Sequence, residues 1–245
     1  MKMNSGEKRF TEIDALRGIA IIMVVIYHLV FDLHFFGVLD GLLPAGGWLI
    51  FGRIAAFLFV FLAGVSIHLS FERAKIEKKF KFSKYLARGA GIFALGMIIS
   101  FATWIYPHDG FIIFGILHLI GICIVLGYFF ERFYFANLIL GATGIAIGFW
   151  ANYRFSDNFI LFIFGFPLDG LWTLDYFPIF PWLGVFLVGM FFGKLMYPKL
   201  RRRISDLKCE NQFCRMLSVF GQNTLLIYFV HQPIILLGLT ILGVI

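Results

Sequence analysis

Charged residues are scarce in this sequence. They make up 14% of its 245 residues, against about a quarter in typical soluble domains. Hydrophobic residues make up 60% and the mean hydropathy is +0.89, which is more apolar surface than a soluble domain of this length could bury. The composition therefore excludes an ordinary soluble protein and predicts one whose solvent is the lipid bilayer.

Cysteine and acidic residues are also few. Three cysteines do not make the disulfide framework of a small secreted protein. The 14 acidic residues are outnumbered by 21 lysines and arginines, which gives a net charge of +7. In a membrane protein such an excess marks cytoplasmic loops, so we do not interpret it as a nucleic-acid interface.

Seven apolar runs are long enough, or nearly so, to cross about 30 Å of hydrocarbon as helices. They lie near residues 16–38, 48–71, 85–105, 111–130, 133–151, 178–197 and 217–242. A further run at 159–168 is short and broken by glycine and proline, so residues 157–170 are expected to form a re-entrant or interfacial segment. We therefore predict an all-α polytopic membrane helix bundle of about seven transmembrane helices, in a single domain over residues 1–245.

The basic residues indicate the orientation of this predicted bundle. They flank the first span and concentrate in and beside the loops 72–84 and 198–216, so that 19 of the 21 fall on one side. By the positive-inside rule this side is cytoplasmic, which places the N-terminus inside and the C-terminus outside. A multi-pass protein of the plasma (inner) membrane is expected.

The first span, EIDALRGIAIIMVVIYHLVFDL, carries four polar residues: Asp14, Arg17, His28 and Asp32. At about 100° per residue they return to one helix face, with His28 about 16 Å beyond Arg17 along the axis. His28 and Asp32 are four residues apart, so the carboxylate can orient the imidazole. Polar groups at bilayer depth are costly, and we favour a functional pair over a packed polar contact between helices.

Other polar residues fall at a similar depth in the outer half of the bundle. They are Arg53, His118, His231 and Gln232, with Asp175 just outside the sixth span. Depth alone would let them converge with His28. His34, His68 and His108 lie nearer span ends and are expected at the interface.

A metal centre is not expected. No two histidines have the i, i+4 spacing of a zinc-binding helix. Only a folded cluster of His28, His118 and His231 could hold a metal ion.

Four blocks of the sequence together resemble a known family. They are RFTEIDALRGIAIIMVVIYHLVFDL, FGILHLIGI, DYFPIFPWLGVFLVGMFFGKL and FGQNTLLIYFVHQPI. In this order they are similar to the heparan-alpha-glucosaminide N-acetyltransferase catalytic-domain family, especially its small bacterial and archaeal members. The first and last blocks also resemble the wider acyltransferase type three superfamily, in which Arg or Lys, ten residues and His mark the first helix. Arg17 and His28 match that spacing.

The resemblance implies a membrane-embedded N- or O-acetyltransferase. It would move an acetyl or acyl group from cytoplasmic acyl-CoA to an amine or hydroxyl of a sugar or envelope glycan on the outer side. The basic loops are suited to binding the anionic donor. No nucleic acid is expected as a partner. A homo-oligomer is compatible with the sequence.

The residues assigned to this reaction fall into three groups. His28 would be the general base with Asp32 as its support, and Arg53, His118 or His231 would hold the oxyanion. Donor-binding candidates are Asp14, Arg17 and Arg53. Acceptor-binding candidates are Asp175, Trp182 and Gln232.

The sequence departs from the lysosomal branch of the family in one respect. That branch has Asn at the position of His28 and a catalytic His near the second span, where this chain has Leu42, Leu43 and Pro44. We therefore expect direct transfer rather than an acyl-histidine, and the lysosomal substrate is not carried over.

Two other classes of function remain open. The chain could be a small proton-coupled transporter that uses the buried His, Asp and Arg residues. It could also be a structural partner of a larger envelope complex.

Overall fold

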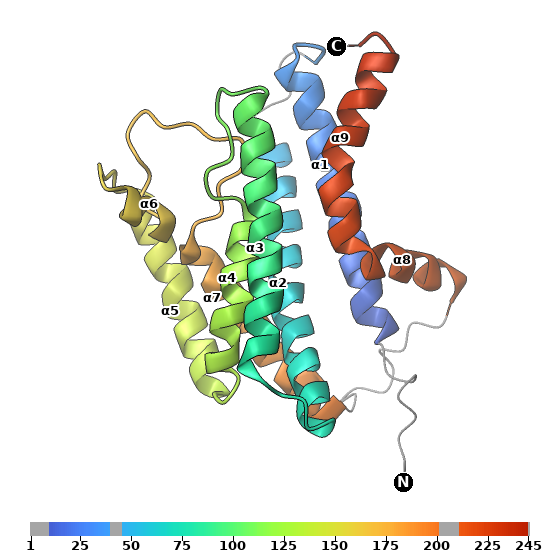
Figure 1. Cartoon of the computed structure of the whole chain (residues 1–245), viewed down its shortest axis with the longest axis vertical. Helices are drawn as coiled ribbons and strands as arrows, with labels where there is room; N and C mark the ends of the chain where they lie inside the picture. Colours follow the sequence, from blue (N-terminus) through green and yellow to red (C-terminus); the bar gives the residue numbers. More distant parts are fainter. Residues whose placement is uncertain (1–9, 40–45, 201–210, 245) are drawn as a thin grey trace. The chain divides into compact units, whose positions relative to one another are not determined.

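The computed structural model describes residues 10–39, 46–200 and 211–244. Its helices are α1 (Thr11–Phe35), α2 (Gly47–Ile76), α3 (Phe82–Ile105), α4 (Ile116–Phe130), α5 (Phe135–Ala151), α6 (Phe159–Phe164), α7 (Ile179–Met196), η1 (Pro198–Leu200), α8 (Gln212–Gln222) and α9 (Thr224–Ile241) (Figure 1). Within the described ranges the only pairing of β type is an isolated bridge between Phe114 and Tyr176. The all-α prediction is therefore confirmed for this part of the chain.

Five helices are long and apolar enough to cross a membrane. They are Thr11–Phe35, Gly47–Ile76, Phe82–Ile105, Ile179–Leu200 and Thr224–Ile241. The predicted spans at 111–130 and 133–151 form the shorter apolar helices α4 and α5. The count of seven spans and the orientation stay predictions. Several of the basic residues on which the orientation depends lie outside the described residues: Lys2, Lys8, Arg9, Arg201, Arg202, Arg203 and Lys208.

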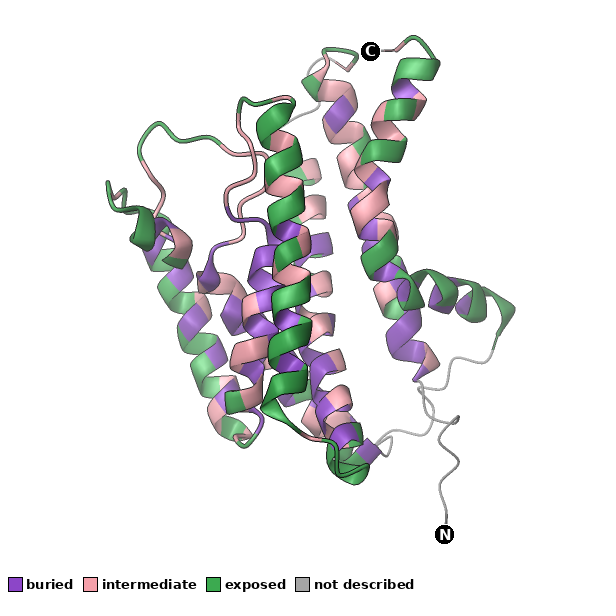
Figure 2. Cartoon of the chain, in the orientation of Figure 1, coloured by how far each residue is buried: buried purple, intermediate pink, exposed green. Residues whose placement is uncertain are grey.

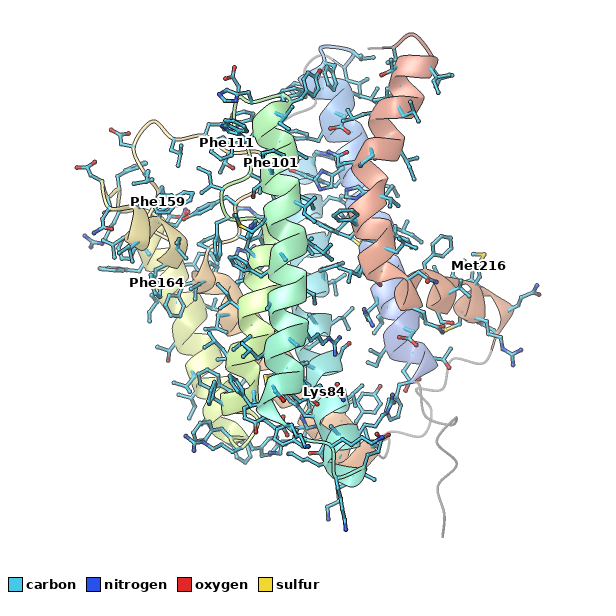
Figure 3. The ribbon with its side chains drawn as sticks, in the orientation of Figure 1. Lys84, Phe101, Phe111, Phe159, Phe164 and Met216 are labelled. Atoms are coloured by element: carbon cyan, nitrogen blue, oxygen red, sulfur yellow. The ribbon has the colours of Figure 1, made fainter. Side chains whose placement is uncertain are left out.

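The outer surfaces of the helices are apolar. Phe101 of α3, Phe159 of α6 and Met216 of α8 are each more than half exposed (Figure 3). Figure 2 shows that exposed residues follow the outer side of α3 and much of α8. Such surfaces are unfavourable in water and suit contact with lipid.

The last predicted span, 217–242, is wrong at its start. Residues 217–222 belong to α8, and α9 begins only at Thr224, because Asn223 (φ −103°, ψ 16°) leaves the helical conformation between them. Asn211 caps α8, with its side-chain oxygen accepting a hydrogen bond from the Cys214 backbone N–H at 2.8 Å. The polar Gln222 and Asn223 therefore separate two helices where the hydropathy suggested one.

The chain divides into two compact units. The first comprises Met1–Leu62 and Ile204–Ile245, and the second comprises Ala63–Arg203. Helix α2 contributes its first half to one unit and its second half to the other. The two units are described separately below.

In the first unit, α1 packs on α8 and α9. Gly18 and Gly221 allow the closest approach, since a Cβ on Gly18 would meet the Leu217 carbonyl and one on Gly221 the Asp14 carbonyl. Figure 1 shows α9 running beside α1, while α8 turns across its lower part. This arrangement lets polar residues in the middle of α1 and α9 face each other.

In the second unit, small residues again set the helix contacts. Gly64 of α2 lies against the carbonyl of Phe186 in α7, and Gly141 of α5 faces Gly184 of α7. Such close contacts are typical of helices that associate in membranes. Helix α6, inside the predicted re-entrant or interfacial segment 157–170, is six residues long and ends at Gly165, whose φ is +116°.

Candidate functional site

Two histidines meet in the first unit. The rings of His28 in α1 and His231 in α9 have centroids 4.9 Å apart. His231 is 6% exposed, and His28 is half-buried, with Tyr27 edge-on to its ring at 5.7 Å. The structure therefore brings together two histidines that lie about two hundred residues apart in the sequence.

One turn along α1, Asp32 contacts the residue that follows His231. The side-chain amide of Gln232 donates to Asp32 Oδ1 at 3.3 Å. Asp32 is 4% exposed, and its second oxygen, Oδ2, is buried with no hydrogen-bond partner among the described residues. No hydrogen bond or ion pair joins Asp32 to His28 within the part of the chain that the structure describes, so the predicted carboxylate–imidazole pair is not formed here.

The His231 ring is oriented by its own helix. Its Nδ1 lies 2.6 Å from the backbone carbonyl oxygen of Tyr228. A carbonyl oxygen only accepts, so Nδ1 carries the proton. The other ring nitrogen, Nε2, is buried and has no hydrogen-bond partner among the described residues.

Two of the three predicted donor-binding residues in the first unit form an ion pair with each other. Arg17 and Asp14, near the start of α1, form an ion pair of 3.8 Å. The Arg17 side chain is 32% exposed and therefore accessible to a ligand. Arg53 in α2 is exposed, and among the described residues no hydrogen bond or ion pair joins it to Asp14 or Arg17.

The second unit holds the other predicted site residues. The Gly115 backbone N–H donates to His118 Nδ1 at 3.1 Å, which leaves the ring proton on Nε2. The His118 ring is 2% exposed and packs edge-on to Phe93 at 4.9 Å. Asp175 Oδ2 accepts a hydrogen bond from the Ile116 backbone N–H at 3.1 Å. His118 and Asp175 therefore both accept hydrogen bonds from backbone N–H groups at the start of α4.

Trp182 lies in the first turns of α7. Its ring contacts Phe177 at 4.9 Å. The convergence of His118, Asp175 and Trp182 with His28 on a single site stays a prediction.

A buried ion cluster in the second unit was not predicted from the sequence. Glu131, at the end of α4, is 3% exposed and accepts hydrogen bonds from His68 Nδ1 at 3.2 Å and Lys75 Nζ at 2.8 Å. Lys75 also donates to Glu72 at 3.1 Å. His68, expected near the membrane interface, is 1% exposed and packs inside the protein: Gly193 leaves room for the ring, and the Glu131 carboxylate holds its Nδ1, while its Nε2 has no hydrogen-bond partner among the described residues.

The charge state of Glu131 follows from these contacts. Burial alone would raise the pKa of its carboxyl, but hydrogen bonds and charge from His68 and Lys75 outweigh burial and hold the pKa below its ordinary 4.5. The only sequence signal was the Glu131–Arg132 pair between two apolar runs.

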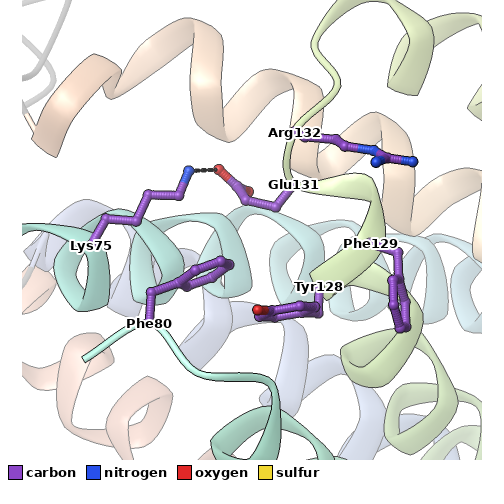
Figure 4. Close-up of a pocket in the computed structure, with 6 residues that line it drawn as sticks. All are labelled: Lys75, Phe80, Tyr128, Phe129, Glu131 and Arg132. Atoms are coloured by element: carbon purple, nitrogen blue, oxygen red, sulfur yellow. Dashed lines mark hydrogen bonds and ion pairs between the residues drawn. The ribbon is translucent and has the colours of Figure 1, made fainter. Parts of the chain in front are cut away.

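A cavity of about 260 Å³ adjoins this cluster. Figure 4 shows its lining, with the Lys75 amine directed at the Glu131 carboxylate and the Phe80 and Tyr128 rings beside them. These two rings are stacked on each other at 4.7 Å, and the Arg132 guanidinium lies over Phe133. Its charged groups are thus engaged within the protein, and we do not assign a substrate to this cavity.

No group of three His, Cys, Asp or Glu side chains that could hold a metal ion occurs within residues 10–39, 46–200 and 211–244.

Comparison with known proteins gives one match. The family model described as "Heparan-alpha-glucosaminide N-acetyltransferase, catalytic" matches residues 9–233, which include α1, α4, α7 and all the site residues above. Searches of curated proteins and of solved structures found no significant match. The chain therefore belongs to the heparan-alpha-glucosaminide N-acetyltransferase catalytic family, and with its apolar helices it is a membrane protein of an acetyltransferase family.

Proposed function

We propose that this protein transfers an acetyl group from acetyl-CoA to an amine or hydroxyl of a sugar or envelope glycan, across the plasma (inner) membrane. The observation that carries the proposal is the contact of His28 with His231 inside apolar helices, in a chain that belongs to an acetyltransferase family. Histidines in contact between apolar helices are costly in a merely structural role, whereas acyl transfer needs a group that takes up and releases a proton.

His28 acts as the general base in this proposal. It takes the proton from the acceptor amine or hydroxyl as that atom attacks the thioester carbonyl. A C–N or C–O bond forms, the C–S bond breaks, and the proton leaves His28 for the departing CoA thiolate. Removing a positioned base of this kind typically costs about 10²–10⁴ in rate.

Arg17 binds the donor. Its guanidinium is partly exposed at the end of α1 that the positive-inside rule assigns to the cytoplasm. CoA carries several phosphate charges, and Arg binds phosphate well because its planar fork makes paired hydrogen bonds. Arg53, in the same unit, is a second donor-binding candidate, and Asp14 holds Arg17 in place through their ion pair.

The acceptor side is assigned to polar and aromatic residues. Gln232 is held by Asp32 in the first unit, while Asp175 and Trp182 belong to the second. Hydrogen-bonding side chains and aromatic rings are both suited to binding a sugar. His118, which presents an Nε2–H, is proposed as the donor to the oxyanion.

The test uses the purified protein in detergent with labelled acetyl-CoA and a set of amino sugars and neutral sugars as acceptors. We expect saturable donor binding and a labelled acetyl-sugar detected by mass spectrometry. Arg17→Ala should weaken donor binding by about 1.5–3 kcal/mol, whereas Arg154→Ala, which removes an exposed Arg outside the basic loops, should leave it unchanged. Absence of donor binding by the folded wild-type protein would contradict the proposal.

A further inference from the structure

The tautomer of His231 follows from the contact of its ring with the backbone. Because Nδ1 donates its proton to the Tyr228 carbonyl at 2.6 Å, the neutral ring has its free lone pair on Nε2. That atom is buried and has no hydrogen-bond partner among the described residues. A neutral His231 held in this way can accept a proton at Nε2 but has no N–H to offer an oxyanion.

The ring next to it is His28. The two ring centroids are 4.9 Å apart with an interplanar angle of 59°. The rings are in contact, but no hydrogen bond joins them in their described positions, so the bond proposed below is one that forms when His28 takes up a proton. Asp32, the support expected from the sequence, accepts a hydrogen bond from Gln232 instead. In the folded protein His231 is therefore better placed than Asp32 to support His28.

We propose that His231 is the proton-sharing partner of His28: its Nε2 accepts a hydrogen bond from the His28 imidazolium that forms during acetyl transfer. This inference rests on the proposed function. One nitrogen of His28 takes the acceptor's proton, and the N–H on its other nitrogen donates to His231 Nε2. When the CoA thiolate leaves, it takes the proton from His28, and both rings return to the neutral state.

Few other polar or charged groups lie near the two histidine rings. On α1 and α9 the neighbouring polar residues are Tyr27, Asp32, Tyr228 and Gln232. The Tyr27 ring lies 5.7 Å from that of His28, and the Tyr228 ring lies 5.3 Å from that of His231. The other packed segments of the unit, residues 47–62 and α8, carry Arg53 and Arg215 as their charged groups, and both are exposed. A pair of imidazoles in contact can hold one proton, while two would repel each other.

The first test needs no acceptor. Nitrogen-15 NMR of the purified protein with labelled histidine should show His231 with its proton on Nδ1 and without one on Nε2, assigned by comparison with His231→Gln. The proposal is overturned if Nε2 carries the proton in the neutral ring.

The second test compares His231→Ala, His231→Gln and His34→Ala. His231→Ala should lower kcat about 10–100-fold, as loss of a supporting partner typically does, with the KM for acetyl-CoA unchanged. His231→Gln keeps an acceptor oxygen and should recover part of the rate. His34, which lies on the same helix as His28, is the control and should retain full activity. Its Nδ1 contacts the Leu39 carbonyl, just beyond that helix, at 2.9 Å.

The outcomes separate this inference from the proposed function. Failure of the wild-type protein to transfer acetyl groups would contradict the proposed function, while the NMR result still decides the state of His231. Active wild-type protein together with an equally active, folded His231→Ala variant would overturn the inference alone. Equal rates for the Ala and Gln variants would also overturn it, because a purely steric role predicts no rescue by the acceptor oxygen.

Discussion

The two units each bury a carboxylate, and the two carboxylates differ in how they are satisfied. Glu131 in the second unit has both oxygens engaged, one by His68 and one by Lys75. Asp32 in the first unit has one contact, with a neutral amide at 3.3 Å, and its other oxygen has no partner in the described part of the chain. A fully paired buried ion stabilises the fold, whereas a buried carboxylate oxygen without a partner among the described residues is costly.

The histidines of the two units differ in what holds the ring, since His68, His118 and His231 all leave Nε2 without a hydrogen-bond partner among the described residues. His68 Nδ1 is held by the Glu131 carboxylate, while His231 Nδ1 is held by a backbone carbonyl and its ring lies beside that of His28. His118 and His231 are held in opposite tautomers, because one accepts from a backbone N–H and the other donates to a backbone carbonyl. Backbone contacts thus prepare one ring to give a proton and the other to take one.

The largest effect is expected for His28→Ala. Removing the base should lower acetyl transfer by about 10²–10⁴, while acetyl-CoA binding and the thermal unfolding midpoint change little. Turnover of purified variants, with donor binding measured on the same samples, checks this. A folded His28→Ala protein with near wild-type turnover would remove His28 from the chemistry.

Glu131→Ala should act on stability instead. It removes the charged acceptor of two hydrogen bonds and leaves the buried His68 ring without its partner, at a cost of about 1–3 kcal/mol. Glu72→Ala, which removes only the second partner of Lys75, is the control and should cost less. Unfolding in detergent, followed by circular dichroism, measures both. If Glu131→Ala were as stable as the wild type, the contrast between the two carboxylates would fail.

Asp32→Asn tests the other buried carboxylate, which we expect to affect the rate more than the stability. Because Asp32 has a single neutral partner, we expect little change in stability and a rate loss of about tenfold, near the lower end for supporting residues. The loss should be smaller than that of His28→Ala measured in the same turnover assay. A loss as large as that of His28→Ala would restore Asp32 as the direct support of the base.

The smallest effect is a pH dependence of stability. The pKa of Glu131 is lower in the folded state than its ordinary 4.5, so its contribution is fully present above that pH. It is lost as the pH falls through the folded-state pKa, since the unfolded chain then binds the proton more readily. The unfolding midpoint of the wild type should fall in this acidic window, and that of Glu131→Gln should fall less. Parallel curves for the two proteins would contradict the assignment.

The sequence was sufficient to predict the helical class and to find the polar residues within the first helix, because both follow from the local pattern of hydropathy and charge. It did not predict the break at Asn223, since Gln222 and Asn223 are two polar residues in a long apolar run. It also missed the partners of Asp32 and His68, which depend on contacts with Gln232 and Glu131 far along the chain. The tautomer of His231 depends on which backbone atom its ring meets, which residue spacing does not fix.

Transfer across a bilayer tests the central claim most directly. Proteoliposomes are loaded with an amino sugar, and acetyl-CoA with a labelled acetyl group is added outside. The account predicts labelled N-acetyl sugar inside the vesicles and an equal amount of free CoA outside, both lost in His28→Ala. Intact acetyl-CoA outside, together with movement of unmodified sugar across the membrane, would contradict it and favour a transporter.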